Sequence, residues 1–124
     1  MKQSKLRHVG ILIKDWERIR PFYEELGFEL VYEQEEDWLN AKIMVRKMQN
    51  KHGDVLEFIS GLWFSHIALT VDESPRKVSF LQHEPQREVS FGKDPEGNWI
   101  EFVKEILENE IEVIDEYRVK KVRR

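Results

Sequence analysis

The feature that most constrains this chain is an internal repeat. Residues 6–15 (LRHVGILIKD) align with residues 64–73 (FSHIALTVDE), 58 positions later, and in both copies Gly or Ala follows a His by two residues. Residues 53–59 (GDVLEFI) align with residues 97–103 (GNWIEFV), 44 positions later, and each copy carries a Glu before a Phe. The pattern predicts two modules with common first and last strands. The second module is shorter in between.

The first module, residues 5–60, is predicted to run strand, helix, strand, strand, strand. The helix is expected over 16–26, because Asp15 is a suitable N-cap and Gly27 a suitable stop. Pro21 falls inside it and predicts a late start or a kink. Four apolar residues recur at helical spacing: Ile19, Phe22, Tyr23 and Leu26. The strands are expected at 6–13, 28–34, 41–48 and 55–60.

The second module, residues 63–103, is predicted to lack the helix. Strands are expected at 64–71 and 99–103, and segments 76–80 and 87–91 are expected to pair around a turn at 83–86. A single helical turn beginning at Pro75 is the alternative. Residues 104–124 form a C-terminal extension in which acids precede bases, an order that favours a helix. Alternating apolar residues there leave a strand open.

Composition excludes several classes of function. The chain of 124 residues has no Cys, so any metal must be held by His, Asp or Glu. Its net charge of −4 argues against nucleic-acid binding. It also has no apolar run of the roughly 18 residues that a membrane span requires. We therefore expect a cytoplasmic protein whose partner is a small-molecule substrate, with no nucleic acid and no membrane involved.

Strand parity predicts where the repeated His and Glu residues point. Side chains alternate across a strand, so His8 and Gly10 share the face opposite to Val9, Ile11 and Ile13, which suits packing under a helix. Taken one at a time, the histidines fit ordinary core residues and the glutamates fit residues that face water. The repeat favours convergence of four residues between the modules: His8, Glu57, His66 and Glu101. Two imidazoles and two carboxylates suit a divalent metal ion such as Zn²⁺, Ni²⁺, Mn²⁺ or Fe²⁺.

Two segments resemble the vicinal-oxygen-chelate superfamily, which includes glyoxalases, bleomycin-resistance proteins and dihydroxybiphenyl dioxygenases. HVGILIKDWERIRPFYEELGFEL is similar to the N-terminal signature of this superfamily, and FGKDPEGNWIEFV to its closing signature. The resemblance implies an α+β fold in which paired βαβββ modules form a cupped mixed sheet. It also implies His8, Glu57, His66 and Glu101 as metal ligands. The implied chemistry is that of a metal-dependent lyase or isomerase, in which Glu101 or Glu57 transfers a proton alpha to a carbonyl through a metal-bound enediolate.

Three further expectations concern the pocket, the function class and the assembly. Five residues are candidates to line a substrate pocket: Trp38, Arg46, Trp63, Phe91 and Trp99. The alternatives in function are a metal-free drug-binding protein of the bleomycin-resistance type and an Fe²⁺ ring-cleaving dioxygenase. A homodimer is expected because a missing helix leaves sheet edges exposed.

Overall fold

The computed structural model describes residues 3–38, 40–75, 78–84 and 86–106. The described residues form one α-helix and eight strands. In chain order the elements are β1 (Ser4–Leu12), α1 (Trp16–Glu25), β2 (Glu29–Trp38), β3 (Ala41–Gln49), β4 (Val55–Gly61), β5 (His66–Val71), β6 (Phe80–Glu84), β7 (Arg87–Lys93) and β8 (Trp99–Glu105). The chain divides into two compact units, residues 7–68 and the described part of 1–6 with 69–124.

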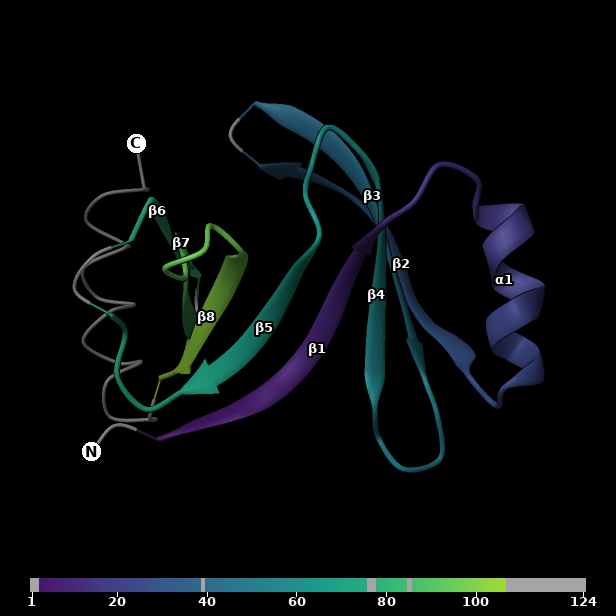
Figure 1. The fold of residues 1–124 in the computed structure, drawn as a ribbon, viewed down its shortest axis with the longest axis horizontal. Helices are drawn as coiled ribbons and strands as arrows, with labels where there is room; N and C mark the ends of the chain where they lie inside the picture. Colours follow the sequence, from purple (N-terminus) through teal and green to yellow (C-terminus); the bar gives the residue numbers. More distant parts are fainter. Residues whose placement is uncertain (1–2, 39, 76–77, 85, 107–124) are drawn as a thin grey trace. The chain divides into compact units, whose positions relative to one another are not determined.

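The unit of residues 7–68 is a mixed sheet covered on one face by α1 (Figure 1). Its strand order is β2-β3-β4-β1-β5. The β1–β4 pair is parallel, whereas β2–β3 and β3–β4 are antiparallel. Beneath the helix lies a core of Ile13, Trp16, Met48 and Phe58, against which Ile11 packs. The prediction that the β-branched face of the first strand packs under the helix is confirmed for Ile11 and Ile13.

Helix α1 begins at Trp16 and ends where Gly27 was expected to stop it. Gly27 adopts φ +94°, and the amides of Gly27 and Phe28 donate to the carbonyls of Glu24 and Tyr23. This is the paired Schellman termination that a residue with positive φ permits. Pro21 lies inside the helix without delaying its start, so of the two expected effects, a late start or a kink, the late start was wrong.

The buried stripe of α1 differs from the predicted one. Ile19 and Tyr23 pack on the core with Trp16, but Phe22 and Leu26 are exposed. Successive helix residues are about 100° apart, so Phe22, next to Tyr23, turns away from the sheet. Leu26 lies past the end of α1, at its C-cap. The prediction counted both sets as one face.

Strand β2 extends four residues beyond the predicted end because its acids pair with bases on β3. Glu33 forms an ion pair with Arg46, and Glu35 and Asp37 both lie near Lys42. Such cross-strand pairs stabilise a sheet even where the apolar alternation fades. The expected strand of residues 28–34 stopped just before the acids of residues 35–37.

The second unit has the strand order β5-β8-β7-β6. Its β6–β7 hairpin corrects the prediction: β6 spans Phe80–Glu84 rather than 76–80, and Glu84 pairs with Arg87. The ladder thus continues through His83, which had been assigned to the turn. Strand β8 reaches Glu105, two residues into the predicted C-terminal extension. The helix expected in that extension falls on residues 107–124, outside the described part.

These observations confirm an α+β chain with a mixed sheet and few helices. The described residues between β5 and β6 contain no helix. The origin of the two strand sets as copies of one module stays a prediction. No helix in the described ranges has the length and apolar character needed to cross a membrane.

Candidate metal site

The sheet of residues 7–68 separates its side chains into an apolar face and a mixed face. Leu56 and Phe58 of β4 pack toward α1, so the alternating Glu57 and Ile59 point the other way. Residues paired in register on neighbouring strands share a face of the sheet. Glu57 pairs with Gly10 on β1 and with Lys47 on β3, so these residues lie on the same side. We call this side, opposite α1, the site face.

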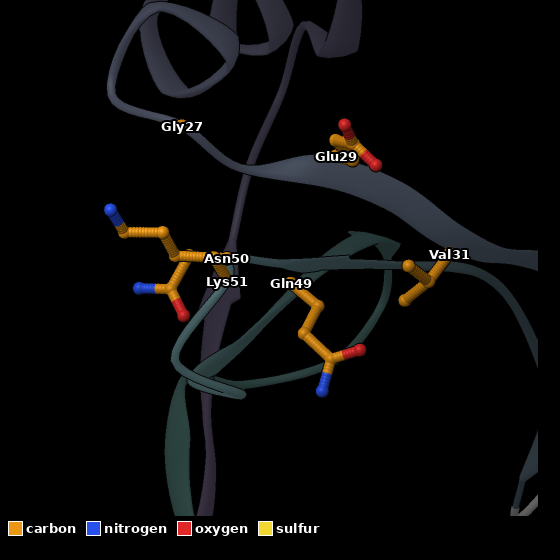
Figure 2. Close-up of a pocket in the computed structure, with 6 residues that line it drawn as sticks. All are labelled: Gly27, Glu29, Val31, Gln49, Asn50 and Lys51. Atoms are coloured by element: carbon orange, nitrogen blue, oxygen red, sulfur yellow. The ribbon is translucent and has the colours of Figure 1, made fainter.

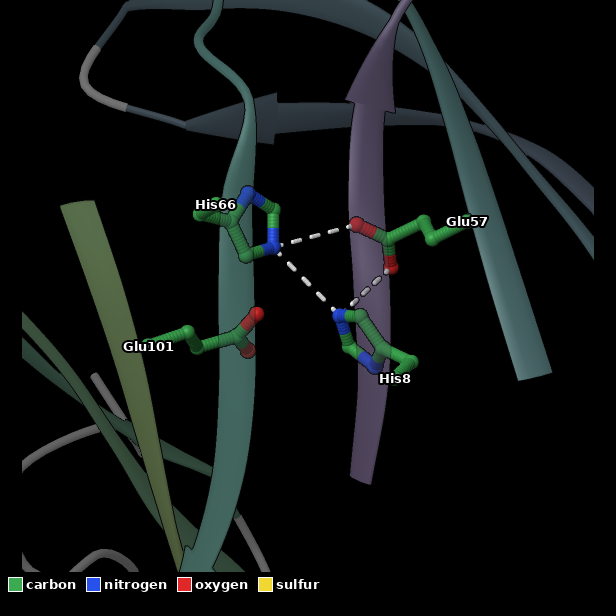
Figure 3. Close-up of side chains that lie close together, drawn as sticks. All are labelled: His8, Glu57, His66 and Glu101. Atoms are coloured by element: carbon green, nitrogen blue, oxygen red, sulfur yellow. Dashed lines mark hydrogen bonds and ion pairs between the residues drawn. The ribbon is translucent and has the colours of Figure 1, made fainter. Parts of the chain in front are cut away.

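Three of the predicted ligands meet on the site face (Figure 3). The Nε2 atoms of His8 and His66 are 3.3 Å apart. Glu57 lies against both rings, with Oε2 3.5 Å from Nε2 of His8 and Oε1 3.5 Å from Nε2 of His66. The three residues are buried, with at most 8% of any of them exposed. The prediction that His8, Glu57 and His66 converge is confirmed.

The other ring nitrogen of His66 faces the backbone. Nδ1 lies 3.2 Å from the carbonyl oxygen of Phe64, which can only accept a hydrogen bond. Nδ1 must therefore carry the proton, and in the neutral ring Nε2 presents a lone pair to Glu57 and His8. A backbone carbonyl that fixes the tautomer in this way is a common outer partner of metal-binding histidines.

Gly10 provides the space for His66. A Cβ placed on Gly10 would lie 2.3 Å from Cε1 of the His66 ring and 2.7 Å from both ring nitrogens. No side chain larger than hydrogen fits there unless the imidazole moves. Gly10 was expected on the same face as His8, and the structure shows that the space above it is filled by the second histidine.

Lys47 lies beside this group and was not among the residues predicted from the sequence. Its Nζ is 3.9 Å from Oε2 of Glu57, and 29% of its side chain is exposed. The alternation of Ile43, Val45 and Lys47 was a usable signal, since it places the lysine on the face of the two apolar residues. Its contact with Glu57 also depends on the β3–β4 register, which the sequence does not specify.

The first three pocket candidates lie on different faces. Trp38 and Trp63 pack on the site face, on a cluster of Ile43, Val45 and Ile59. Arg46 lies on the α1 side, where it donates to Glu33 at 2.7 Å and its guanidinium is 5.1 Å from the centre of the Trp16 ring. Arg46 is therefore a structural residue of the helix-covered face, and we leave it out of the proposed pocket.

The remaining predicted site residues belong to the second unit. Glu101 of β8 pairs in register with Phe91 of β7, and Trp99 precedes it by two residues, so the three share a face of their own unit. Phe91 is buried, and Nζ of Lys93 lies 4.7 Å from the centre of the Trp99 ring. Glu101 is the third residue of β8, as Glu57 is the third of β4.

A hollow of about 230 Å³ lies elsewhere, at the end of α1 (Figure 2). Its lining is Gly27, Glu29, Val31, Gln49, Asn50 and Lys51. It contains none of the predicted site residues and no imidazole. The hollow offers no group of metal ligands, whereas His8, Glu57 and His66 form one.

Comparisons with known proteins add little to this description. No family model and no curated protein matches the chain. Among solved structures, a glyoxalase family protein from Bacillus cereus is similar, with 13% sequence identity and a TM-score of 0.43. The match covers 83% of this chain and 95% of that one. The function proposed below therefore rests on the residues of this chain.

Proposed function

We propose that this protein is a metal-dependent lyase or isomerase of the glyoxalase type, which moves a proton alpha to a carbonyl. The observation that carries the proposal is the buried group of His8, Glu57 and His66, whose donor atoms face one another at 3.3–3.5 Å. A carboxylate and two imidazoles buried together suit a cation, because uncompensated lone pairs in a dry site are costly.

The distances also fit a small divalent ion. Ligand atoms about 2.0–2.1 Å from a tetrahedral ion lie about 3.3–3.4 Å from one another. The two imidazole nitrogens are separated by 3.3 Å, and each is 3.5 Å from an oxygen of Glu57. Nitrogen and carboxylate donors are those that Zn²⁺, Ni²⁺, Mn²⁺ and Fe²⁺ accept.

Glu101 is proposed as the fourth ligand and as the base. Its support is the sequence repeat, in which it corresponds to Glu57, and its equivalent third position in its strand. Catalytic sites of this kind usually combine three firm protein ligands with an exchangeable position. Both oxygens of Glu57 already face an imidazole, which favours Glu57 as the permanent ligand and Glu101 as the group that exchanges protons.

A divalent ion bound here would act as a Lewis acid toward a carbonyl oxygen. The remaining steps belong to the residues of the chain. The Glu101 carboxylate takes the proton from the carbon next to the carbonyl, and the electron pair of that C–H bond moves toward the carbonyl. The carboxylic acid so formed then returns the proton to the neighbouring carbon. General-base catalysis of this type contributes roughly 10²–10⁴-fold.

Metal analysis of freshly purified protein tests the proposal. We expect about one equivalent of a divalent metal in the wild type and its loss in His66→Ala. His52→Ala is the matched control, because His52 lies in an exposed turn and should keep the metal. Added Zn²⁺ or Ni²⁺ should raise the melting temperature of metal-free wild type, since binding favours the folded state.

Three results would separate the alternatives. Wild type that neither contains metal nor gains stability from Zn²⁺, Ni²⁺ or Mn²⁺ would overturn the proposal. Ligand binding that persists in both His8→Ala and His66→Ala would favour a metal-free binding protein. Oxygen uptake with a catechol would favour a dioxygenase. The homodimer is a separate proposal, tested by light scattering.

A further inference from the structure

Lys47 borders the cluster of His8, Glu57 and His66 on the site face. Its Nζ approaches Oε2 of Glu57 at 3.9 Å, and this oxygen also lies 3.5 Å from His8. An ion held by these residues would be within about 6 Å of the ammonium, given metal–oxygen bonds of about 2 Å. Lys47 is thus the cation beside the proposed reaction centre.

The position of Lys47 is fixed from its other side by aromatic packing. Its Nζ lies 4.8 Å from the centre of the Tyr32 ring, a distance typical of a cation–π contact. The hydroxyl of Tyr32 donates to Glu36 at 2.6 Å, and Nε1 of Trp38 donates to the same carboxylate at 2.9 Å. The ring is therefore held by a hydrogen-bonded group, and the ammonium rests between it and Glu57.

Within the described ranges, Lys47 makes a charge contact with Glu57 but no hydrogen bond. An ammonium has three N–H donors, so they remain available to a ligand. Arg46, the next residue, differs because its guanidinium already donates to Glu33 on the opposite face. Lys47 is partly exposed, so a small molecule on the site face can reach it.

We propose that Lys47 binds an anionic oxygen of the substrate, which makes the substrate a small 2-oxo or 2-hydroxy acid. When a divalent ion neutralises Glu57, the ammonium loses its only charge partner among the described residues and is repelled by the ion. A carboxylate bound beside the ion restores a partner for Lys47. The inference rests on the proposed function, and it adds the charge of the substrate and a residue that selects it.

Isothermal titration tests the inference with Zn²⁺ alone and then with two probes of the Zn²⁺-loaded protein. Hydroxypyruvate carries a carboxylate, and dihydroxyacetone replaces it with a neutral hydroxymethyl group. We expect Lys47→Gln to bind Zn²⁺ about tenfold more tightly, because a repulsive charge is lost. It should bind hydroxypyruvate roughly tenfold more weakly and dihydroxyacetone unchanged.

Lys42→Gln is the matched control, since it removes the same charge from the same strand. Lys42 is paired with Glu35 and Asp37 at the surface. The affinities of Lys42→Gln for Zn²⁺ and for hydroxypyruvate should therefore stay at wild-type values. Lys47→Met preserves most of the side-chain length and replaces Lys47→Gln if circular dichroism shows that the latter is unfolded.

The remaining outcomes overturn either the role of Lys47 alone or both proposals. Equal hydroxypyruvate affinity in wild type and Lys47→Gln, or no binding by either, would overturn the role of Lys47 while the metal site stands. If Lys47→Gln binds Zn²⁺ more tightly but hydroxypyruvate as the wild type does, Lys47 only neutralises Glu57. This result also overturns the inference. Wild type that binds no Zn²⁺ would refute the proposed function and this inference with it.

Discussion

Replacing Gly10 by Ala is expected to damage the proposed metal site through a single methyl group. The backbone of Gly10 is outside the positive-φ region, so Ala is conformationally acceptable there. Elsewhere in a strand this substitution would stabilise the protein by roughly 0.5–1 kcal/mol, because Gly loses more chain entropy on folding. At residue 10 the new Cβ would instead lie 2.3 Å from Cε1 of His66.

The size of the effect follows from that distance. Ordinary van der Waals contact begins at 3.4 Å, so the imidazole must shift by about 1 Å. Metal–ligand bonds tolerate only about 0.2 Å. We expect metal affinity to fall at least 10–100-fold, or about 1.4–2.7 kcal/mol, the loss seen when the orientation of a ligand is disturbed. Overpacking should also destabilise the metal-free protein by about 1–3 kcal/mol.

A double-mutant cycle isolates this contact. Urea unfolding of metal-free protein gives the free energy for wild type, Gly10→Ala, His66→Ala and the double variant, and titration with Zn²⁺ gives the affinities. With His66 truncated the clash is gone, so Gly10→Ala should become neutral or slightly stabilising. Wild-type Zn²⁺ affinity in Gly10→Ala would refute the reasoning. An equal cost of the substitution in both backgrounds would show that His66 is not its cause.

Three further predictions concern the core, the turn from Asp94 to Asn98 that precedes β8, and the proposed metal site. Phe58→Ala should cost about 3–5 kcal/mol in urea unfolding because Phe58 is fully buried, whereas Phe22→Ala, at a residue 61% exposed, should cost under about 1 kcal/mol. Hydrogen bonds from Asn98 lower the pKa of Asp94, so its carboxylate stabilises the fold above its ordinary pKa of 3.8 and this contribution is lost as pH falls below it. The stability difference between wild type and Asp94→Asn should therefore shrink between pH 5 and 2, and a constant difference would contradict the assignment. Chelation with EDTA should lower the melting temperature of wild type but not of His66→Ala, by the equivalent of about 2.7 kcal/mol where free metal had been 100 times Kd.

The sequence predicts the convergence of His8, Glu57 and His66 better than it predicts their surroundings. Side chains alternate between the two faces of a strand, whatever its partner strands are. This local rule correctly placed His8 and Ile11 on opposite faces. The repeat then linked His8 to His66 across 58 residues. These two signals were enough to predict that His8, Glu57 and His66 lie together.

These signals do not predict features that depend on strand register. Arg46 and Lys47 are neighbours with similar charge, yet one pairs with Glu33 and the other approaches Glu57. The β6–β7 hairpin was misplaced for the same reason, since its ladder continues to Glu84 and leaves only two residues between the strands. Pairing of that kind is a long-range interaction, which apolar alternation within one strand does not encode.

The charges on the site face bear on both the empty and the loaded state of the proposed metal site. Glu57 lies against two imidazoles and one ammonium, so the charge of Lys47 offsets that of Glu57 when no metal is bound. A divalent ion within about 6 Å of Lys47 would be repelled by at least about 1.4 kcal/mol at the dielectric constant of water, and by more inside the protein. Lys47 therefore stabilises the empty site and opposes the loaded one. An anion that binds both the ion and Lys47 removes the repulsion, so metal and an acidic substrate should each raise the affinity for the other, as linkage requires.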